Sequence, residues 1–344
     1  MQDKGNRSWW QSPAPVHPAL RLEAVKTGLV LGGGGLVGMG YHAGVLKALD
    51  EAGLDPCSSD VVVGTSAGAI MAAYLTTGWT PERLYDLAHG RHADSPSGPE
   101  AYQAEVRAIF DPLAHHRGER LRRLLGGAFA AAAARGVWRR VAGDRMPPQT
   151  LRRAFPSGMY STSATRARLW RELPAGWPDA ELYIPAVDLF TGARTVFGMP
   201  DAYDAPLPEA VLASTSIPGV FPPVRIGGRW YVDGGVASAT SLDLATAAGC
   251  ERIVCVAPLS YQKENERLSL ADRSALKAVL VRSQFARSLK KEVAEARTRG
   301  IDVLVVSPLL AELAVHGANS MRPYDRAVVI ESARRNTLRM LEAF

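Results

Sequence analysis

The stretch TGLVLGGGGLVG, residues 27–38, decides the fold of this chain. Its first part, Thr27–Leu31, is an apolar run of strand length, and Gly32–Gly35 follow it as a tight loop. The spacing of apolar residues then predicts a helix over residues 39–52, which Gly53 would end. A buried strand that enters a helix through a glycine loop is typical of an α/β fold.

The same order is repeated directly afterwards in DVVVGTSAG, residues 60–68. The apolar run predicts a second buried strand over residues 60–63, and small residues predict a helix over 69–77. Two strand–turn–helix units in succession predict a mostly parallel sheet with helices on its faces. Apolar runs predict further strands at residues 182–187, 195–197, 226–232, 253–256 and 303–306, and two more helices are expected over 268–299 and 327–341.

Composition suggests an ordinary globular chain with an added segment. Hydrophobic residues make up 47% and charged residues 22% of the 344 residues, which excludes a disordered tail or a disulfide-rich miniprotein. We expect a loose lead-in over residues 1–25, a main domain over 26–310 and a C-terminal helical segment over 311–344. Within the main domain, residues 90–176 are expected to form an arginine-rich helical insertion.

The positive charge is concentrated in that insertion. Residues 105–171 hold 14 arginines, no lysine and four acidic residues, whereas the whole chain has a net charge of +6. Such a segment attracts anions, either nucleic acid or an anionic membrane surface, unless it is simply a solvated helical face. Neither a signal peptide nor a membrane-spanning run is recognised, and the three cysteines form no CxxC pair. We therefore expect a cytoplasmic protein.

Gly64–Gly68 has the G-x-S-x-G form of a nucleophile elbow. In this turn the chain bends so sharply between strand and helix that only small residues fit around the serine. Ser66 would stand exposed above the sheet, at the positive end of the following helix. The pattern predicts that Ser66 is a nucleophile for acyl transfer.

A serine needs a base within hydrogen-bond reach. Asp233 ends the apolar run Trp230–Val232 and precedes two glycines, which places it at the carboxyl end of a strand, where open α/β sheets hold their sites. Asp188 also ends a strand and is a weaker competitor. Only His316 comes late enough in the chain to serve in a Ser–Asp–His order, and otherwise it would be a surface loop residue.

The glycine loop supplies the third part of an acyl-transfer site. Successive glycines let several backbone N–H groups approach a substrate carbonyl and stabilise the negative charge that develops on its oxygen. Gly33–Gly38 also matches the G-x-G-x-x-G pattern of a dinucleotide site. That interpretation requires an acid at the end of the second strand, where this chain has Thr65 and Ser66, so we favour the oxyanion loop.

Taken in order, Gly33–Gly38, Gly64–Gly68 and Asp233–Gly235 resemble the motifs of the patatin-like phospholipase family. A fourth stretch, ASTSIPGVFPP at residues 213–223, is similar to the segment that precedes the aspartate strand in that family. The likeness covers roughly residues 26–308. It implies a three-layer α/β/α sandwich and hydrolysis of lipid acyl esters by a Ser–Asp dyad that needs no histidine, metal or other cofactor.

By position, the resemblance makes Ser66 the nucleophile and Asp233 the proton acceptor. It assigns the oxyanion hole to the backbone of Gly33, Gly34 and Gly35. One position departs from the family, which usually has Arg or Lys where this chain has Val37. That side chain is thought to help hold the oxyanion loop, but the donors themselves are backbone groups. The remaining motif glycines are Gly38, Gly64, Gly68, Gly234 and Gly235.

The sequence therefore predicts a serine lipid acyl hydrolase of the phospholipase A or esterase type. Its expected partners are a phospholipid or other acyl-ester substrate and an anionic membrane surface touched peripherally, and no nucleic acid is expected. Two alternatives stay open. One is an α/β-hydrolase-type esterase that uses Ser66, Asp233 and His316, and the other is a non-catalytic membrane-binding module.

Overall fold

The computed structural model describes residues 25–91, 104, 107–112, 158–200, 204–262, 273–321 and 325–342. The expected lead-in lies almost wholly outside these residues, and so does most of the predicted insertion at 90–176. The sheet, the helices named below and the candidate site lie within the described residues.

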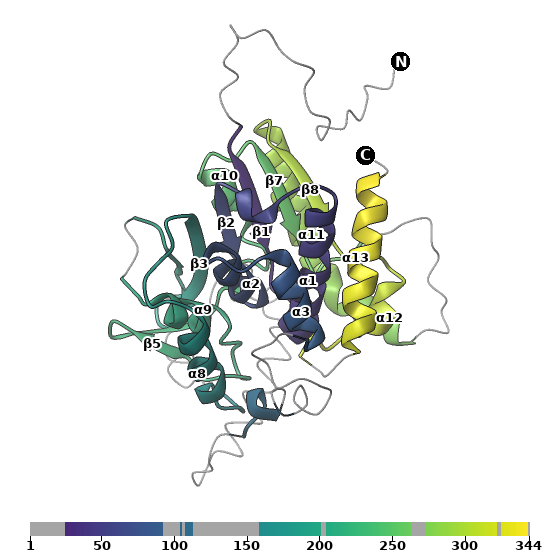
Figure 1. Ribbon diagram of the computed structural model, residues 1–344. Helices are drawn as coiled ribbons and strands as arrows, with labels where there is room; N and C mark the ends of the chain where they lie inside the picture. Colours follow the sequence, from purple (N-terminus) through teal and green to yellow (C-terminus); the bar gives the residue numbers. More distant parts are fainter. Residues whose placement is uncertain are drawn as a thin grey trace, which may run out of the picture.

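An eight-stranded sheet forms the centre of the molecule, with the strand order β5-β6-β3-β2-β1-β7-β8 and β4 paired to β3 (Figure 1). Strands β3, β2, β1, β7 and β8 run parallel, whereas β4, β5 and β6 join antiparallel. The mostly parallel sheet expected from the sequence is thus confirmed. The strands are β1 Thr27–Leu31, β2 Val61–Gly64, β3 Glu181–Asp188, β4 Arg194–Phe197, β5 Val224–Ile226, β6 Arg229–Asp233, β7 Arg252–Val256 and β8 Asp302–Val306.

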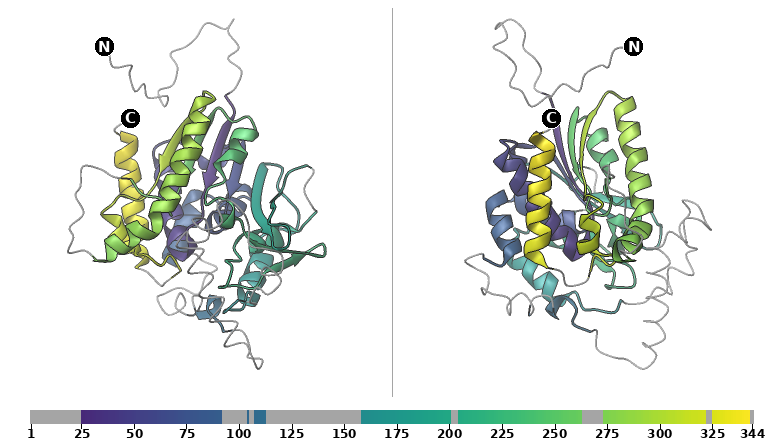
Figure 2. Two further views of the ribbon diagram at one scale, coloured as in Figure 1. Left: turned by 180° about the vertical axis from the view of Figure 1, so that it is seen from behind. Right: turned by 90° about the vertical axis from the view of Figure 1, so that its right-hand side faces the viewer.

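Helices cover both faces of the sheet and make a three-layer α/β/α sandwich, as expected. Figure 2 (right) shows α11 on one side of the sheet and α1 with α13 on the other. Adjacent strand residues enter different cores: Leu29 and Leu31 pack with α1 and α2, whereas Val30 packs with α10 and α11. The helices are α1 Gly35–Glu51, α2 Ala67–Thr76, α3 Pro81–His89, α8 Ser163–Glu172, α9 Leu207–Ser214, α10 Leu242–Ala247, α11 Arg273–Thr298, α12 Glu312–His316 and α13 Arg326–Glu342.

The first two helices begin earlier than the apolar spacing predicts. Helix α1 starts at Gly35, inside the glycine loop, and α2 starts at Ala67, directly after Ser66. Both helices begin with small residues, which do not show the alternation of apolar and polar side chains from which a helix is predicted. As a result, the glycine loop and Ser66 each lie at the N-terminus of a helix.

The strand expected over residues 226–232 is wrong as a single element. It is a hairpin in which β5 and β6 are joined by Gly227 and Gly228, with φ of 53° and 82°. Two successive positive φ angles allow the tight two-residue turn that fits the twist of antiparallel strands. The glycine pair was the local signal for this turn.

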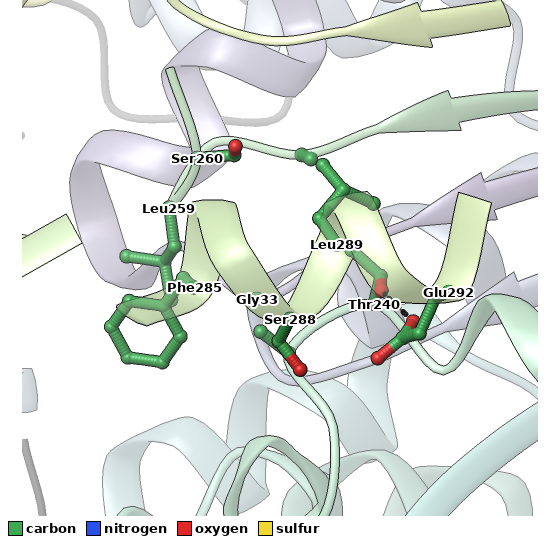
Figure 3. A pocket seen from close by; sticks show the side chains of 10 residues that line it. Gly33, Thr240, Leu259, Ser260, Phe285, Ser288, Leu289 and Glu292 are labelled. Carbon is green, nitrogen blue, oxygen red and sulfur yellow. Dashed lines mark hydrogen bonds between the residues drawn. The ribbon is translucent and has the colours of Figure 1, made fainter. Parts of the chain in front are cut away.

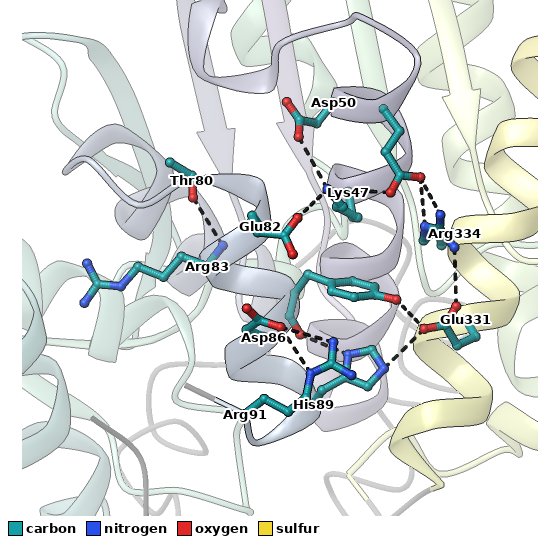
Figure 4. Close-up of polar contacts among 12 residues, drawn as sticks. Lys47, Asp50, Thr80, Glu82, Arg83, Asp86, His89, Arg91, Glu331 and Arg334 are labelled. Atoms are coloured by element: carbon teal, nitrogen blue, oxygen red, sulfur yellow. Dashed lines mark hydrogen bonds and ion pairs between the residues drawn. The ribbon is translucent and has the colours of Figure 1, made fainter. Parts of the chain in front are cut away.

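Helix α13 packs along α1 on the same face of the sheet as α3. A Cβ atom at Gly44 of α1 would lie 2.3 Å from the Ile330 carbonyl oxygen, so the absence of a side chain lets the two helices approach. Ion pairs connect α1 with α3 and α13 (Figure 4). Lys47 of α1 contacts Glu82 of α3 and Glu51 of its own helix, and Arg334 of α13 also contacts Glu51. The segment 311–344 thus contributes to the same core as the preceding strands.

Candidate active site

Ser66 occupies a strained turn between β2 and α2. Its backbone has φ 54° and ψ −120°, a conformation that side-chain-bearing residues rarely adopt. The neighbouring glycines are required by contact: a Cβ at Gly68 would lie 1.9 Å from the Leu31 carbonyl oxygen, and one at Gly64 would lie 2.6 Å from Ala72 Cβ. The turn has the backbone form that the G-x-S-x-G pattern predicts. The expected exposure of Ser66 is wrong, because the residue is only 6% exposed.

Asp233 lies at the end of β6, and its Oδ2 accepts a hydrogen bond from Ser66 Oγ at 2.7 Å. Strand β2 pairs with the first part of β3, whereas β6 runs antiparallel along the last part and brings Asp233 opposite Ala186. The carboxyl ends of β2 and β6 therefore face each other. Asp233 reaches the site by this antiparallel return and not as one of the parallel strand ends on which its prediction relied.

Asp233 is 5% exposed, and its carboxylate is held by hydrogen bonds on both oxygens. Its Oδ1 accepts the Gly235 N–H at 2.7 Å, and Gly234 must lack a side chain because a Cβ there would lie 2.2 Å from the Pro185 carbonyl oxygen. Burial raises the pKa of Asp233 to about 6, while the hydrogen bonds from Ser66 and Gly235 act in the opposite direction. At neutral pH the carboxylate is ionised yet poised to take up a proton.

Ser214, which the sequence motifs did not single out, fixes the backbone at Ser66 relative to strand β3. Its buried hydroxyl accepts the Ser66 N–H at 3.1 Å and donates to the Pro185 carbonyl oxygen at 2.7 Å. Two residues further on, the Ser216 carbonyl oxygen accepts the Asp233 N–H at 3.0 Å. The stretch 213–223, noted only for its resemblance, thus connects the nucleophile turn to the aspartate strand.

The glycine loop lies directly against Ser66. A Cβ at Gly33 would lie 3.4 Å from Ser66 Cβ, and one at Gly34 would lie 2.9 Å from Pro258 Cβ. Gly35 has φ 59° and packs so closely on Ser320 and Met321 that no side chain fits. Close approach of the backbone explains the run of glycines.

The amides of this loop have different partners. The Gly33 N–H donates to the Ala239 carbonyl oxygen at 2.7 Å, which differs from its expected role as an oxyanion donor. The amides of Gly34 and Gly35, at the start of α1, have no acceptor among the described residues, as is usual for the first turn of a helix. Val37, where the family has a basic residue, is buried in the core.

His316 is not a surface loop residue, which corrects that expectation. It ends α12, is 1% exposed and meets the ring of Tyr41 edge-on at 5.7 Å. Burial and the neighbouring Arg282 lower its pKa to about 3. Both oxygens of Asp233 are occupied by Ser66 and Gly235, and neither ring nitrogen of His316 has a partner within the described residues.

Asp188 ends β3 as expected but serves a turn. Its Oδ1 accepts the N–H groups of Phe190 and Thr191, and its Oδ2 pairs with Arg229 at 3.3 Å. These contacts outweigh burial and lower the pKa of Asp188. Its bonds stabilise a loop and leave it no contact with Ser66.

A narrow pocket opens beside Gly33, between the end of β7 and helix α11 (Figure 3). Its cavity volume is only about 10 Å³, room for about one water molecule, and Leu259, Phe285 and Leu289 form its apolar wall. A Cβ built on Gly33 would lie 3.4 Å from Ser66 Cβ and 3.9 Å from Leu259 Cδ1. Gly33 therefore separates the pocket from the nucleophile by a single residue. Its polar end is Glu292, which accepts hydrogen bonds from Ser238 and Thr240.

Most of the arginine-rich segment lies outside the described residues. The arginines that are described near its end are paired: Arg166 contacts Glu209, and Arg168 and Arg171 contact Glu172. In the parts of the chain that the structure describes, no three His, Cys, Asp or Glu side chains gather as a metal site requires. Those parts also contain no helix both long and apolar enough to cross a bilayer.

Comparison with known proteins identifies the family of this chain. Residues 29–246 match the family model described as patatin-like phospholipase, and the chain therefore belongs to this family. The matched range includes both Ser66 and Asp233.

Among curated proteins, the chain is similar to uncharacterised NTE family proteins of Mycobacterium tuberculosis and Mycobacterium bovis, each 29% identical over 261 residues. These alignments cover 72% of this chain and 35% of each relative, so the chain spans about a third of their length.

Among solved structures, VipD of Legionella pneumophila has a TM-score of 0.42 at 17% identity, covering 93% of this chain and 67% of VipD. ExoU of Pseudomonas aeruginosa, in its complex with SpcU, has a TM-score of 0.37 at 22% identity, covering 92% of this chain and 51% of ExoU.

Proposed function

We propose that the chain hydrolyses carboxylic esters of lipids with a Ser66–Asp233 dyad. The observation that carries this proposal is the 2.7 Å hydrogen bond from Ser66 Oγ to a buried carboxylate, formed on a strained turn beside a glycine loop. Direct contact between hydroxyl and carboxylate lets Asp233 act as the base that activates the nucleophile.

The reaction then proceeds in two halves. Ser66 Oγ attacks the ester carbonyl carbon as its proton passes to Asp233 Oδ2, and the tetrahedral intermediate collapses to an acyl-serine when Asp233 returns that proton to the leaving alcohol. Water next attacks the acyl-serine and gives a proton to Asp233. Release of the carboxylic acid returns this proton to Ser66 Oγ.

The oxyanion of each tetrahedral intermediate would be stabilised by the N–H groups of Gly34 and Gly35. Both lie at the positive N-terminus of α1, and a Cβ on Gly33 of the same loop would lie 3.4 Å from Ser66 Cβ. Since the Gly33 amide donates to Ala239, it supports the loop and leaves the charge to the two amides that follow.

The substrate class follows from the apolar pocket and from the family. We assign the wall of Leu259, Phe285 and Leu289 to the acyl chain, because it is an apolar surface close to Ser66. The pocket, at about 10 Å³, has to widen to admit that chain. A phospholipid or other acyl ester is the substrate, and the basic segment makes peripheral contact with an anionic membrane surface. Cytoplasmic location stays a prediction, and no nucleic acid is involved in this proposal.

The dyad is tested by Ser66→Ala and Asp233→Asn, assayed on a medium-chain ester and on phospholipid vesicles. Each variant should lose activity by a factor of about 10³ or more, since loss of either member removes the activated nucleophile. Ser58→Ala and Asp302→Asn are matched controls, because both residues are exposed and lie at or just before the amino ends of parallel strands. Full activity in either dyad variant would contradict the assignment. An inactive wild-type chain that still binds anionic vesicles would support the non-catalytic module instead.

A further inference from the structure

A fully buried histidine, His42, contacts the backbone of the glycine loop. It lies in α1, is 0% exposed, and its Nε2 is 2.7 Å from the Gly32 carbonyl oxygen. A carbonyl can only accept, so Nε2 carries the hydrogen in this contact. Burial lowers the pKa of His42 to about 4, and the ring is therefore neutral at physiological pH.

The contact completes a clamp on one peptide unit. The Gly32 carbonyl oxygen accepts from His42, and the N–H on the other side of the same peptide, from Gly33, donates to the Ala239 carbonyl oxygen at 2.7 Å. A peptide between two glycines rotates at little steric cost, because neither residue has a Cβ. Holding both polar atoms restrains ψ of Gly32 and φ of Gly33, and with them the direction in which the chain enters Gly34.

We propose that His42 is a positioning residue that holds the Gly32–Gly33 peptide so that the next two amides face the oxyanion. This inference rests on the proposed function of Ser66 and Asp233. His42 acts through its Nε2 hydrogen bond alone and exchanges no proton with substrate. Its other ring nitrogen, Nδ1, is buried without a partner in the described part of the chain.

The simpler alternative is a histidine that only fills space in the core. Three substitutions separate the two roles. His42→Gln places an N–H near the position of Nε2, whereas His42→Asn is too short to reach Gly32, and His42→Met fills the space without a donor.

With an ester substrate, we expect the Gln variant to stay within about threefold of wild-type kcat, and the Asn and Met variants to lose about 10- to 100-fold. The loss should fall on kcat with KM little changed, because the oxyanion exists only in the transition state. Binding of a trifluoromethyl ketone, which forms a charged tetrahedral adduct with serine, should weaken in parallel. A role in packing alone would change thermal stability without this selective loss.

Wild-type kcat in a folded Asn or Met variant would overturn the inference, and so would a folded Gln variant as slow as Met. Should these variants not fold, ¹⁵N NMR of the unaltered chain is decisive: a buried imidazole protonated at Nδ1 in place of Nε2 would also overturn it. If the wild-type chain hydrolyses no ester at all, the proposed function fails. If the wild-type chain is active and the His42 variants are equally active, only the positioning role is refuted.

Discussion

Burial of Asp233 sets the pH at which the dyad would work. The carboxylate has to be ionised to accept the Ser66 proton, and its pKa is raised to about 6 because burial disfavours the charge. We expect kcat/KM to fall about tenfold per pH unit below about pH 6 and to level off above it. A pH–rate profile on a neutral ester measures this, and a profile that stays flat down to pH 4 would contradict it.

The same pKa shift has a consequence for stability, with a definite sign. The folded chain holds the Asp233 proton up to about pH 6, whereas the ordinary pKa of an aspartate in water is 3.8. Between about pH 4 and about pH 6 the unfolded chain has lost this proton while the folded chain still holds it. The contribution of Asp233 to the free energy of unfolding therefore falls as pH rises through this range, and it stays low above about pH 6. Asp233→Asn should remove this fall, which thermal melts of both proteins across that range would reveal.

Phe285 tests the assignment of the apolar pocket to the acyl chain. It lines the pocket beside Leu259 (Figure 3), and Phe285→Ala should open space for a longer chain. Each further buried methylene contributes about 0.8 kcal/mol, or about fourfold in kcat/KM. We expect the preferred length in a series of p-nitrophenyl esters to increase. Leu280→Ala on the same helix is the control, because Leu280 is 74% exposed. An unchanged length profile in Phe285→Ala would refute the assignment.

At the scale of elements, the nucleophile turn depends on close packing between β1, β2 and α2. Gly68→Ala would force a Cβ to within 1.9 Å of the Leu31 carbonyl oxygen, a backbone atom that cannot move aside. We expect a loss of about 1–3 kcal/mol or more in the free energy of unfolding, together with loss of activity. Chemical denaturation measures the change. Gly176→Ala is the matched control, since nothing lies within 4 Å of its position and it should cost less than about 0.5 kcal/mol.

Helix α11 braces the loops around the site from the other face of the sheet. Arg282, 2% exposed, donates to the carbonyl oxygens of Pro258 and Gly317, and Pro258 packs on Gly34. Further along the helix, Glu292 accepts from Ser238 and Thr240, which flank the Ala239 carbonyl that holds Gly33. The glycine loop is therefore supported by neighbouring segments, while Val37, in the first turn of α1, lies in the core.

At the scale of the whole molecule, charge distribution governs the expected membrane contact. The arginine-rich stretch at residues 105–171 predicts binding to anionic vesicles that weakens steeply with salt, because screening shortens the reach of surface charge. Co-sedimentation of the Ser66→Ala variant with phosphatidylglycerol vesicles measures binding apart from catalysis, with phosphatidylcholine vesicles as the control. Binding that resists salt would instead indicate apolar insertion.

Apart from the hairpin of β5 and β6, the strands could be predicted, and so could the fold class and the form of the serine turn, because each depends mainly on residues close together in the sequence. Apolar runs have to be buried, and the sharp strand-to-helix bend at Ser66 requires glycine at positions 64 and 68. These are local steric and burial constraints, which appear directly in the order of residues.

Tertiary structure alone decided how the parts of the site meet. The antiparallel return of β6 brings Asp233 to Ser66, the Ala239 carbonyl occupies the Gly33 amide, and His42 reaches Gly32 from within α1. None of these contacts can be deduced from spacing, because each depends on the register between strands or on packing between segments of the chain. Burial of His316, which removes it from the surface, is decided in the same way, by the helices that close over it.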